Sequence, residues 1–191
     1  MSTEIVLVPG LRGSAPDHWQ ERMAATTGAT HLPVGRDPLD LDGRVGDLDA
    51  VVSSASDRVL LVAHSAGVLT LLHWAAGASA EQCRRVAAAL LVTPPTLRAE
   101  LPPVYPRLSQ MREAGWLPVP SGRLPFASTV LVSEDDALGP PDEVAELAES
   151  WGSALVPAGH VGHANPASGF GAWPFVEEVV EDLLGVSRPR V

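Results

Sequence analysis

The sequence predicts an α/β fold: a single domain, residues 1–191, in which a mostly parallel sheet of about six strands carries helices on both faces. Three observations predict it. Short apolar runs alternate with longer stretches of helical periodicity, as in chains whose buried parallel strands are joined by crossover helices. A chain of 191 residues, 46% of them hydrophobic, is long enough for one sizeable core. Eighteen prolines and seventeen glycines indicate many sharply shaped connections.

The strands are expected where apolar runs have strand length. The runs at 5–8, 58–64 and 86–92 are almost uninterrupted, which is typical of strands buried on both faces. Pro9 and Gly10 end the first of them. In order along the chain, the predicted strands are 5–8, 31–34, 58–64, 86–92, 129–133 and 154–156.

The helices are expected from their end signals and their periodicity. Pro16 opens the first and Gly28 stops it. In the second, apolar residues recur every three to four positions from Leu41 to Val52. The last, an amphipathic segment, follows a glycine-rich loop at 157–173. The predicted helices are 16–27, 42–55, 66–76, 80–85, 105–114, 141–151 and 174–184.

Charge excludes several classes of function. All 13 basic residues are arginine, against 23 acidic residues, so the formal net charge is −10. Because no segment combines basic and aromatic residues, neither nucleic acid nor an anionic membrane surface is expected as a partner. The absence of lysine excludes a P-loop lysine, a Schiff base and a Ser–Lys pair. The one cysteine, Cys83, cannot form an internal disulfide, which favours a reducing, cytoplasmic compartment.

Neither a signal peptide nor a membrane-spanning helix is expected. The N-terminal apolar run is short and lacks a basic flank. Residues 59–80 carry no formal charge over 22 positions, which is long enough to cross a bilayer. Because His64, Ser65, Gly67 and His73 interrupt this stretch, we interpret it as a strand, a turn and a helix.

The first candidate for chemistry lies in that turn. The sequence AHSAG at 63–67 places Ser65 between a strand and a helix, with a small residue two positions to either side. This is the nucleophile-elbow pattern, with Ala63 in place of the usual first glycine. The N–H of Ala66 is then expected to help bind an oxyanion, and His64 to point to the opposite side of the strand. Alternatively, Ser65 is a buried turn residue that caps the helix.

A serine nucleophile needs a base, and the base needs an orienting acid; in this pattern they follow in the order acid, then histidine. Three consecutive carboxylates, Glu134, Asp135 and Asp136, follow a predicted strand. At least one should turn inward, unless the run only caps the next helix. The base is expected to be His160 or His163, in a glycine-rich loop. The same pair could instead ligate a metal, but zinc would need a third ligand.

The loop after the first strand, PGLRGSAPDHW at 9–19, can supply a second oxyanion donor. We expect the N–H of Leu11 in this role, with Arg12 as the alternative. His18 and Trp19 are expected either to line the mouth of the site and contact substrate or to pack the following helix. Without a lysine the loop is not a phosphate-binding loop.

Four motifs, in this order, carry a resemblance to a known family: PGLRGSAPDHWQ, VAHSAG, SEDDALGP and GHVGHANPASGFGAWP. The sequence resembles the small serine hydrolases related to retinoblastoma-binding protein 9, which have the α/β-hydrolase fold. The resemblance implies that Ser65 is the nucleophile, Asp136 the acid and His163 the base. The family places the acid one residue before a proline, and Ala137 occupies that position here, so Asp135 stays an alternative.

The resemblance implies hydrolysis of a small acyl ester, or of an amide or peptide, through an acyl-enzyme and without a cofactor or metal. An idle hydrolase-shaped module that binds a protein partner is the alternative, and a metal-dependent hydrolase the third. The proline-rich segment 93–127 falls where larger relatives insert a lid and is too short for a full cap domain. We expect an open pocket bordered by Tyr105 or Trp116. Four arginines of this segment indicate either an anionic substrate or a solvated surface: Arg98, Arg107, Arg112 and Arg123.

Overall fold

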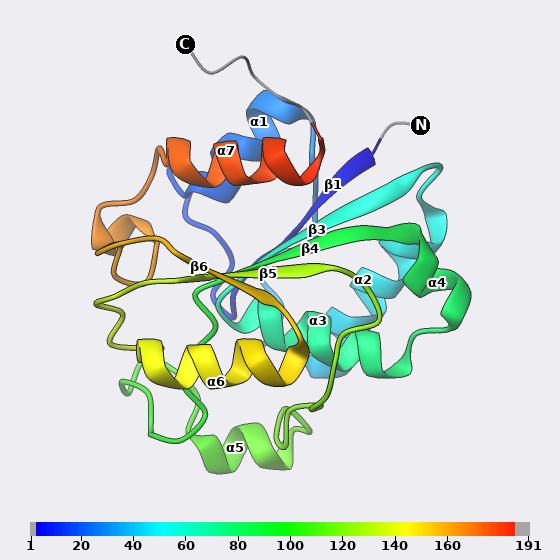
Figure 1. Cartoon of the computed structure of the whole chain (residues 1–191). Coiled ribbons are helices and arrows are strands. Elements are labelled where there is room, and N and C mark those ends of the chain that lie inside the picture. Colours follow the sequence, from blue (N-terminus) through cyan, green and yellow to red (C-terminus); the bar gives the residue numbers. More distant parts are fainter. Residues whose placement is uncertain (1–2, 186–191) are drawn as a thin grey trace.

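The computed structural model describes residues 3–185, which form a six-stranded sheet between two layers of helices (Figure 1). All neighbouring strands are parallel, in the order β2-β1-β3-β4-β5-β6. The predicted three-layer α/β fold is therefore confirmed. The strands are β1 (Thr3–Val8), β2 (Thr30–His31), β3 (Arg58–His64), β4 (Val86–Val92), β5 (Ser128–Val132) and β6 (Ala154–Pro157).

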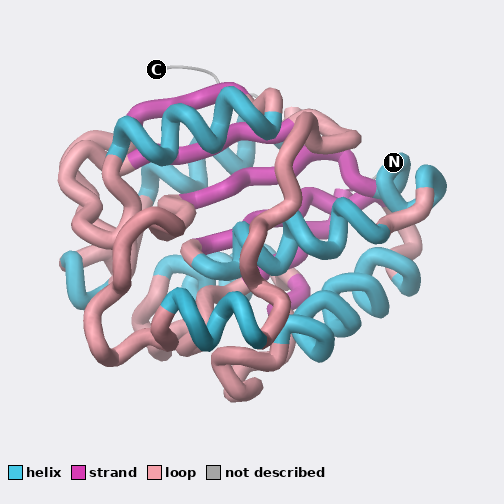
Figure 2. Tube along the Cα trace, turned by 90° about the horizontal axis from the view of Figure 1, so that it is seen from below, coloured by secondary structure: helices cyan, strands magenta, loops and turns pink. Residues whose placement is uncertain are grey.

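Helices cover both faces of the sheet. In Figure 1, α1 and α7 lie above it and α2, α3, α5 and α6 lie below it. Figure 2, viewed from below, shows the lower helices in front of the strands. The helices are α1 (Trp19–Thr27), α2 (Leu41–Ser54), α3 (Ala66–Gly77), α4 (Ala80–Arg85), α5 (Leu108–Glu113), α6 (Pro141–Trp151) and α7 (Pro174–Leu183). None of the described helices is both long and apolar enough to cross a membrane.

The strands are apolar at successive positions because each face of the sheet has its own core. Leu60 and Val62 of β3 pack in the cluster that includes Trp19 of α1 and Val176 of α7. Leu61, between them, packs in the opposite cluster with α2, α3 and α6. Since side chains alternate between the faces of a strand, both sets must be apolar. This is why the uninterrupted runs predicted strands correctly.

Helix α1 begins at Trp19, three residues later than predicted. Residues 15–18 form a turn instead, in which the His18 N–H donates to the Ala15 carbonyl over 2.8 Å. His18 then caps the helix, because its Nδ1 accepts the Gln20 N–H over 3.1 Å. Two other elements are also shorter than predicted, namely β2 (Thr30–His31) and α5 (Leu108–Glu113).

The order of the strands places a crevice at one edge of the sheet. From β1 the chain moves first to β2 on one side and then to β3 on the other. The loop after β1 leads to α1 above the sheet, and the turn after β3 leads to α3 below it (Figure 1). Connections that diverge in this way leave a crevice at the carboxyl ends of the two strands, where ligands bind in open α/β sheets.

The proline-rich segment 93–127 contributes one α-helix, α5, and no cap domain. Trp116, which we expected at the border of the pocket, is fully buried in the core below the sheet. Its indole N–H points to the Leu39 carbonyl, 3.4 Å away. Tyr105, in contrast, lines the cavity beside Ser65, as expected.

Candidate active site

Ser65 occupies a strained turn at the end of β3. Its backbone has φ 56° and ψ −128°, a left-handed conformation that non-glycine residues rarely adopt. The turn is held by the Ser65 N–H, which donates to the Val92 carbonyl over 2.9 Å. Gly67 must be glycine, because a Cβ there would lie 2.2 Å from the Val8 carbonyl oxygen. The buried Ala63 is accommodated, so the predicted turn is present.

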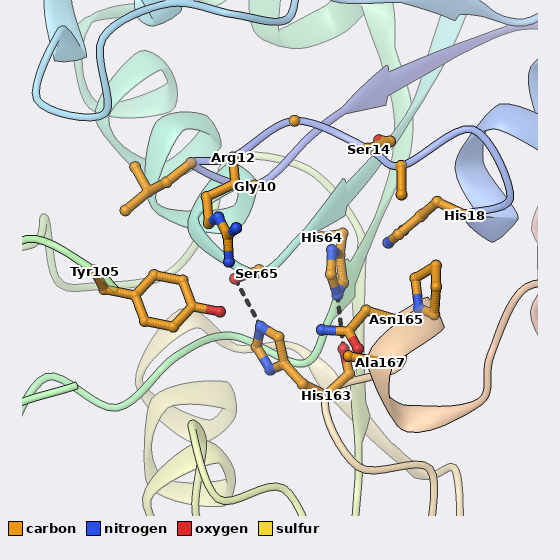
Figure 3. A pocket seen from close by; sticks show the side chains of 14 residues that line it. Gly10, Arg12, Ser14, His18, His64, Ser65, Tyr105, His163, Asn165 and Ala167 are labelled. Atoms are coloured by element: carbon orange, nitrogen blue, oxygen red, sulfur yellow. Dashed lines mark hydrogen bonds between the residues drawn. The ribbon is translucent and has the colours of Figure 1, made fainter. Parts of the chain in front are cut away.

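Two hydrogen bonds connect the serine, a histidine and a carboxylate (Figure 3 shows the first). His163 Nε2 lies 2.8 Å from Ser65 Oγ, and His163 Nδ1 lies 2.8 Å from Asp136 Oδ2. His163 and Asp136 are buried, with 7% and 4% of their surface exposed. Because an ionised carboxylate only accepts hydrogen bonds, it fixes the imidazole proton on Nδ1 and leaves Nε2 as an acceptor for the Ser65 hydroxyl.

The three consecutive carboxylates have three different positions. Only Asp136 reaches His163. Asp135 Oδ1 accepts the Gly162 N–H over 2.7 Å and the Ser133 hydroxyl over 2.9 Å, and these bonds lower the pKa of Asp135. Glu134 lies outside, 3.4 Å from the exposed His160. Asp135 therefore anchors the loop that carries His163, and Asp136 contacts the ring itself.

Two further side chains fix the backbone around His163. His64 Nε2 lies 2.9 Å from the His163 carbonyl, and Trp19 donates its indole N–H to the Ala164 carbonyl over 2.8 Å. Trp19 is 2% exposed and packs in the core under α7, so it supports this loop and does not line the cavity. The expectation that Trp19 contacts substrate is therefore wrong. Burial lowers the pKa of His64 well below its usual value.

The loop after β1 forms a tight turn beside Ser65. The Gly13 N–H donates to the Gly10 carbonyl over 3.0 Å, and a Cβ on Gly10 would lie 3.3 Å from Ser65 Cβ. Arg44 of α2 holds this turn from below: its guanidinium donates to the Leu11 carbonyl over 2.8 Å and to the Gly10 carbonyl over 3.4 Å. No motif in the sequence marks Arg44 as part of the site.

Those carbonyl contacts determine where the amides of the turn point. In a trans peptide the C=O and the next N–H point in opposite directions. With the Gly10 carbonyl directed at Arg44, the Leu11 N–H points away from the Arg44 guanidinium. Ala66, the first residue of α3, likewise has an N–H without an intrahelical acceptor. Leu11 and Ala66 therefore remain the two expected oxyanion donors.

A cavity of about 300 Å³ opens above Ser65 and His163. Figure 3 shows Arg12 and Tyr105 on one side of Ser65, and His18 and Asn165 on the other. Burial, with a smaller contribution from His31, lowers the pKa of His18 to about 4, so its ring is neutral near pH 7. The residues that line the cavity are Gly10, Leu11, Arg12, Gly13, Ser14, Ala15, His18, His64, Ser65, Tyr105, His163, Asn165, Pro166 and Ala167.

Two alternatives that the sequence left open, a metal site and an arginine-lined pocket, differ from the structure. His160 and His163 diverge, since His160 is exposed beside Glu134 and His163 is buried against Asp136. Among residues 3–185, no group of three or more His, Cys, Asp or Glu side chains is arranged to hold a metal ion. The arginines of the proline-rich segment do not line the cavity around Ser65, and Arg98 pairs with Glu146 instead.

Solved structures share this fold over nearly the whole chain. A protein described as a YdeN-like hydrolase from Pectobacterium atrosepticum is 24% identical, with a TM-score of 0.80 over 98% of this chain and 94% of that chain. The ydeN gene product from B. subtilis is 22% identical, with a TM-score of 0.70 over 96% and 100%. A monoacylglycerol lipase from Paleococcus ferrophilus is 15% identical, with a TM-score of 0.65 over 98% and 97%.

At these identities the structures establish the α/β-hydrolase fold only. No protein with a curated function matches the sequence. A family model does: the model described as serine hydrolase matches residues 5–182, a range that begins within β1, ends within α7 and contains every residue of the site described above. The chain belongs to the serine hydrolase family.

Proposed function

We propose that this protein hydrolyses small acyl esters through an acyl-enzyme, with Ser65 as nucleophile, His163 as general base and Asp136 as the acid that orients it. One observation carries the proposal: the unbroken series of 2.8 Å hydrogen bonds from Ser65 through His163 to Asp136, which opens onto a cavity at the serine end. A serine hydroxyl becomes nucleophilic when a base takes its proton, and that base works in one tautomer when a carboxylate fixes it.

Acylation would proceed in two steps. The Ser65 oxygen attacks the ester carbonyl carbon while its proton passes to His163 Nε2, and the carbonyl oxygen becomes an oxyanion. The N–H groups of Leu11 and Ala66 donate to that oxyanion. The intermediate then collapses: the bond to the leaving oxygen breaks, His163 returns the proton to the departing alcohol, and the acyl group stays on Ser65.

Water completes the cycle by the same route. It attacks the acyl carbon and gives its proton to His163, which protonates Ser65 as the acid product leaves. The buried, neutral rings of His18 and His64 keep additional positive charge away from the imidazolium that forms on His163. No cofactor takes part in this scheme.

Several observations support a small ester as the substrate. The cavity of about 300 Å³ is at the lower end of the range for small-molecule sites. A structural neighbour is a monoacylglycerol lipase, an ester hydrolase. Within the family, two motifs favour a relationship to the hydrolases related to retinoblastoma-binding protein 9, namely PGLRGSAPDHWQ and GHVGHANPASGFGAWP. An amide substrate would be hydrolysed by the same steps. We also propose a cytoplasmic location for the protein.

Labelling by a fluorophosphonate probe tests the mechanism, since such probes react with activated serines. We expect wild type to be labelled, Ser65→Ala not to be labelled and His163→Ala to be labelled at least a hundredfold more slowly. Circular dichroism checks that each variant is folded. A folded wild type that resists the probe would contradict the proposal and favour a hydrolase-shaped module that acts by binding a protein.

A further inference from the structure

Arg12 brings a cation into the cavity beside Ser65. Its side chain is exposed, lines the cavity and extends toward Ser65 in Figure 3. Among residues 3–185, its guanidinium has neither an ion pair nor a hydrogen bond. By contrast, Arg36 binds Asp47 and Arg98 binds Glu146.

The remaining side chains of the cavity do not neutralise this charge. None of its lining residues is Asp or Glu. The carboxylate of Asp136 is 4% exposed and lies behind His163, to which it is hydrogen-bonded. In a chain of net charge −10, a cation beside the proposed nucleophile therefore stays available for a ligand.

Tyr105 adds a neutral donor on the same side. It is the only tyrosine of the chain, it lies on the proline-rich segment, and its hydroxyl points into the cavity in Figure 3. No hydrogen bond joins that hydroxyl to another of the described residues. A guanidinium and a hydroxyl that share one side of a cavity offer three or more N–H and O–H donors and match the two oxygens of a carboxylate.

We propose that Arg12 and Tyr105 form a carboxylate-binding subsite, and that the preferred substrates are esters carrying a carboxylate close to the scissile bond. The inference rests on the proposed esterase function and specifies its substrate class. It also explains why a small, strongly acidic protein has an arginine at this position, since its overall field would otherwise repel an anionic substrate.

Two matched pairs of esters test the subsite and locate the carboxylate. In the first pair, 4-nitrophenyl hemisuccinate and 4-nitrophenyl butyrate differ in charge on the acyl side. In the second, 4-acetoxybenzoate and phenyl acetate differ in charge on the leaving group. The affected pair is the one whose carboxylate reaches Arg12 and Tyr105. For that pair we expect Arg12→Gln to lower the anionic-to-neutral ratio of kcat/KM about tenfold, and Tyr105→Phe to lower it about threefold. The wild-type ratio should also fall as salt is added.

Arg84→Gln is the matched control, because Arg84 is exposed at the opposite edge of the sheet and its loss changes the net charge equally. It should leave both ratios unchanged. A charge reversal gives a second readout: Arg12→Glu should lower the anionic-to-neutral ratio of the affected pair further than Arg12→Gln does, because a carboxylate at this position repels the carboxylate of the substrate. If Arg12→Gln leaves both ratios at the wild-type value, the subsite is overturned.

Failure of the esterase function can be distinguished from failure of the subsite. If wild type hydrolyses neither neutral ester and resists the fluorophosphonate probe, the proposed function is wrong. Calorimetry then tests the carboxylate-binding subsite without catalysis, by measuring the binding of succinate, the acid released from 4-nitrophenyl hemisuccinate. About tenfold weaker binding of succinate by Arg12→Gln, with Arg84→Gln unchanged, supports the subsite, and equal binding by all three proteins overturns it.

Discussion

Asp135 and Asp136 have the same side chain, yet they contact different atoms of the loop that carries His163. Asp136 reaches the imidazole, and Asp135 holds the Gly162 N–H of the backbone. The sequence limited the candidates for the orienting acid to residues 134–136, because carboxylates that follow a strand are expected at the carboxyl ends of the strands, where the site lies. It could not choose between neighbours, since the direction of a side chain in an irregular turn depends on contacts with residues that lie about 27 positions further along the chain.

Substituting each aspartate by asparagine separates the two functions. Asp136→Asn removes the charge that fixes the His163 tautomer, so kcat for 4-nitrophenyl butyrate should fall by about 10³-fold or more. Asp135→Asn keeps an oxygen that can accept from Gly162 and Ser133, so kcat should fall less than about tenfold. Steady-state kinetics on both proteins checks this, and equal losses would show that the structure assigns the wrong carboxylate to the ring.

Ser65 and His163 could be predicted because their local sequences constrain the backbone strongly. A serine between small residues at a strand–helix junction, and a histidine in a glycine-rich loop, are visible in one stretch of sequence. Trp19 could not be assigned in this way. A tryptophan at the start of a helix can line the mouth of a cavity or pack beneath it. Only the contact with Ala164, 145 residues away, decides between these two positions.

At the scale of elements, the sequence predicted the interior strands better than the ends of helices. Each of β3 and β4 is buried on both faces, so its apolar run coincides with the strand. Pro16 is compatible with a helix start, but the cap depends on which side chain reaches an open N–H, and here that is His18. Strand β2 lies at the sheet edge and pairs over two residues only, so it has little burial to mark it.

Helix α2 acts on the site through one buried side chain. Arg44 is 8% exposed, its two terminal nitrogens donate to the Gly10 and Leu11 carbonyls, and its Nε has no hydrogen-bond partner among the described residues. Burial of an incompletely satisfied guanidinium costs stability. In the sequence, an arginine on an acidic helix resembles a solvated residue, which is why this contact was not predicted.

Removing the Arg44 guanidinium should therefore impair catalysis through the turn it holds. For Arg44→Met we expect kcat to fall about 10- to 100-fold with a smaller change in KM, because the Leu11 N–H loses its fixed orientation toward the oxyanion. Arg85→Met is the control, since Arg85 also donates to a carbonyl, that of Ala55, over 2.8 Å but far from the cavity. Both variants should lose stability to urea, and an equal kcat in both would refute a positioning role for Arg44.

Over the whole molecule, three histidine rings join the elements that make up the site. His64 of β3 lies between His18, with ring centroids 4.9 Å apart, and His163, with centroids 5.1 Å apart. Burial is the largest cause of the lowered pKa values of His18 and His64. These two rings are thus neutral in the folded protein at pH values where an unfolded chain would protonate them. The free energy of unfolding therefore depends on pH.

Stability should therefore fall as the pH drops below about 6.5. The folded-state pKa of His18 is about 4 and its ordinary value is 6.5, so the unfolded chain binds the extra proton and unfolding becomes easier between those values. From pH 7.5 to 5.5 this costs about 1 kcal/mol for His18, and His64 adds a loss of the same sign. Urea denaturation of wild type at the two pH values measures the total.

His64→Gln isolates one contribution, because glutamine can still donate to the His163 carbonyl but cannot titrate. Its free energy of unfolding should decrease less than that of wild type over the same pH step, because one group that must gain a proton on unfolding has been removed. His160→Gln, on the exposed side of the same loop, should behave as wild type does. If His64→Gln loses as much stability as wild type, then His64 is not held neutral in the fold, and the pH dependence comes from His18 or from groups outside the three rings.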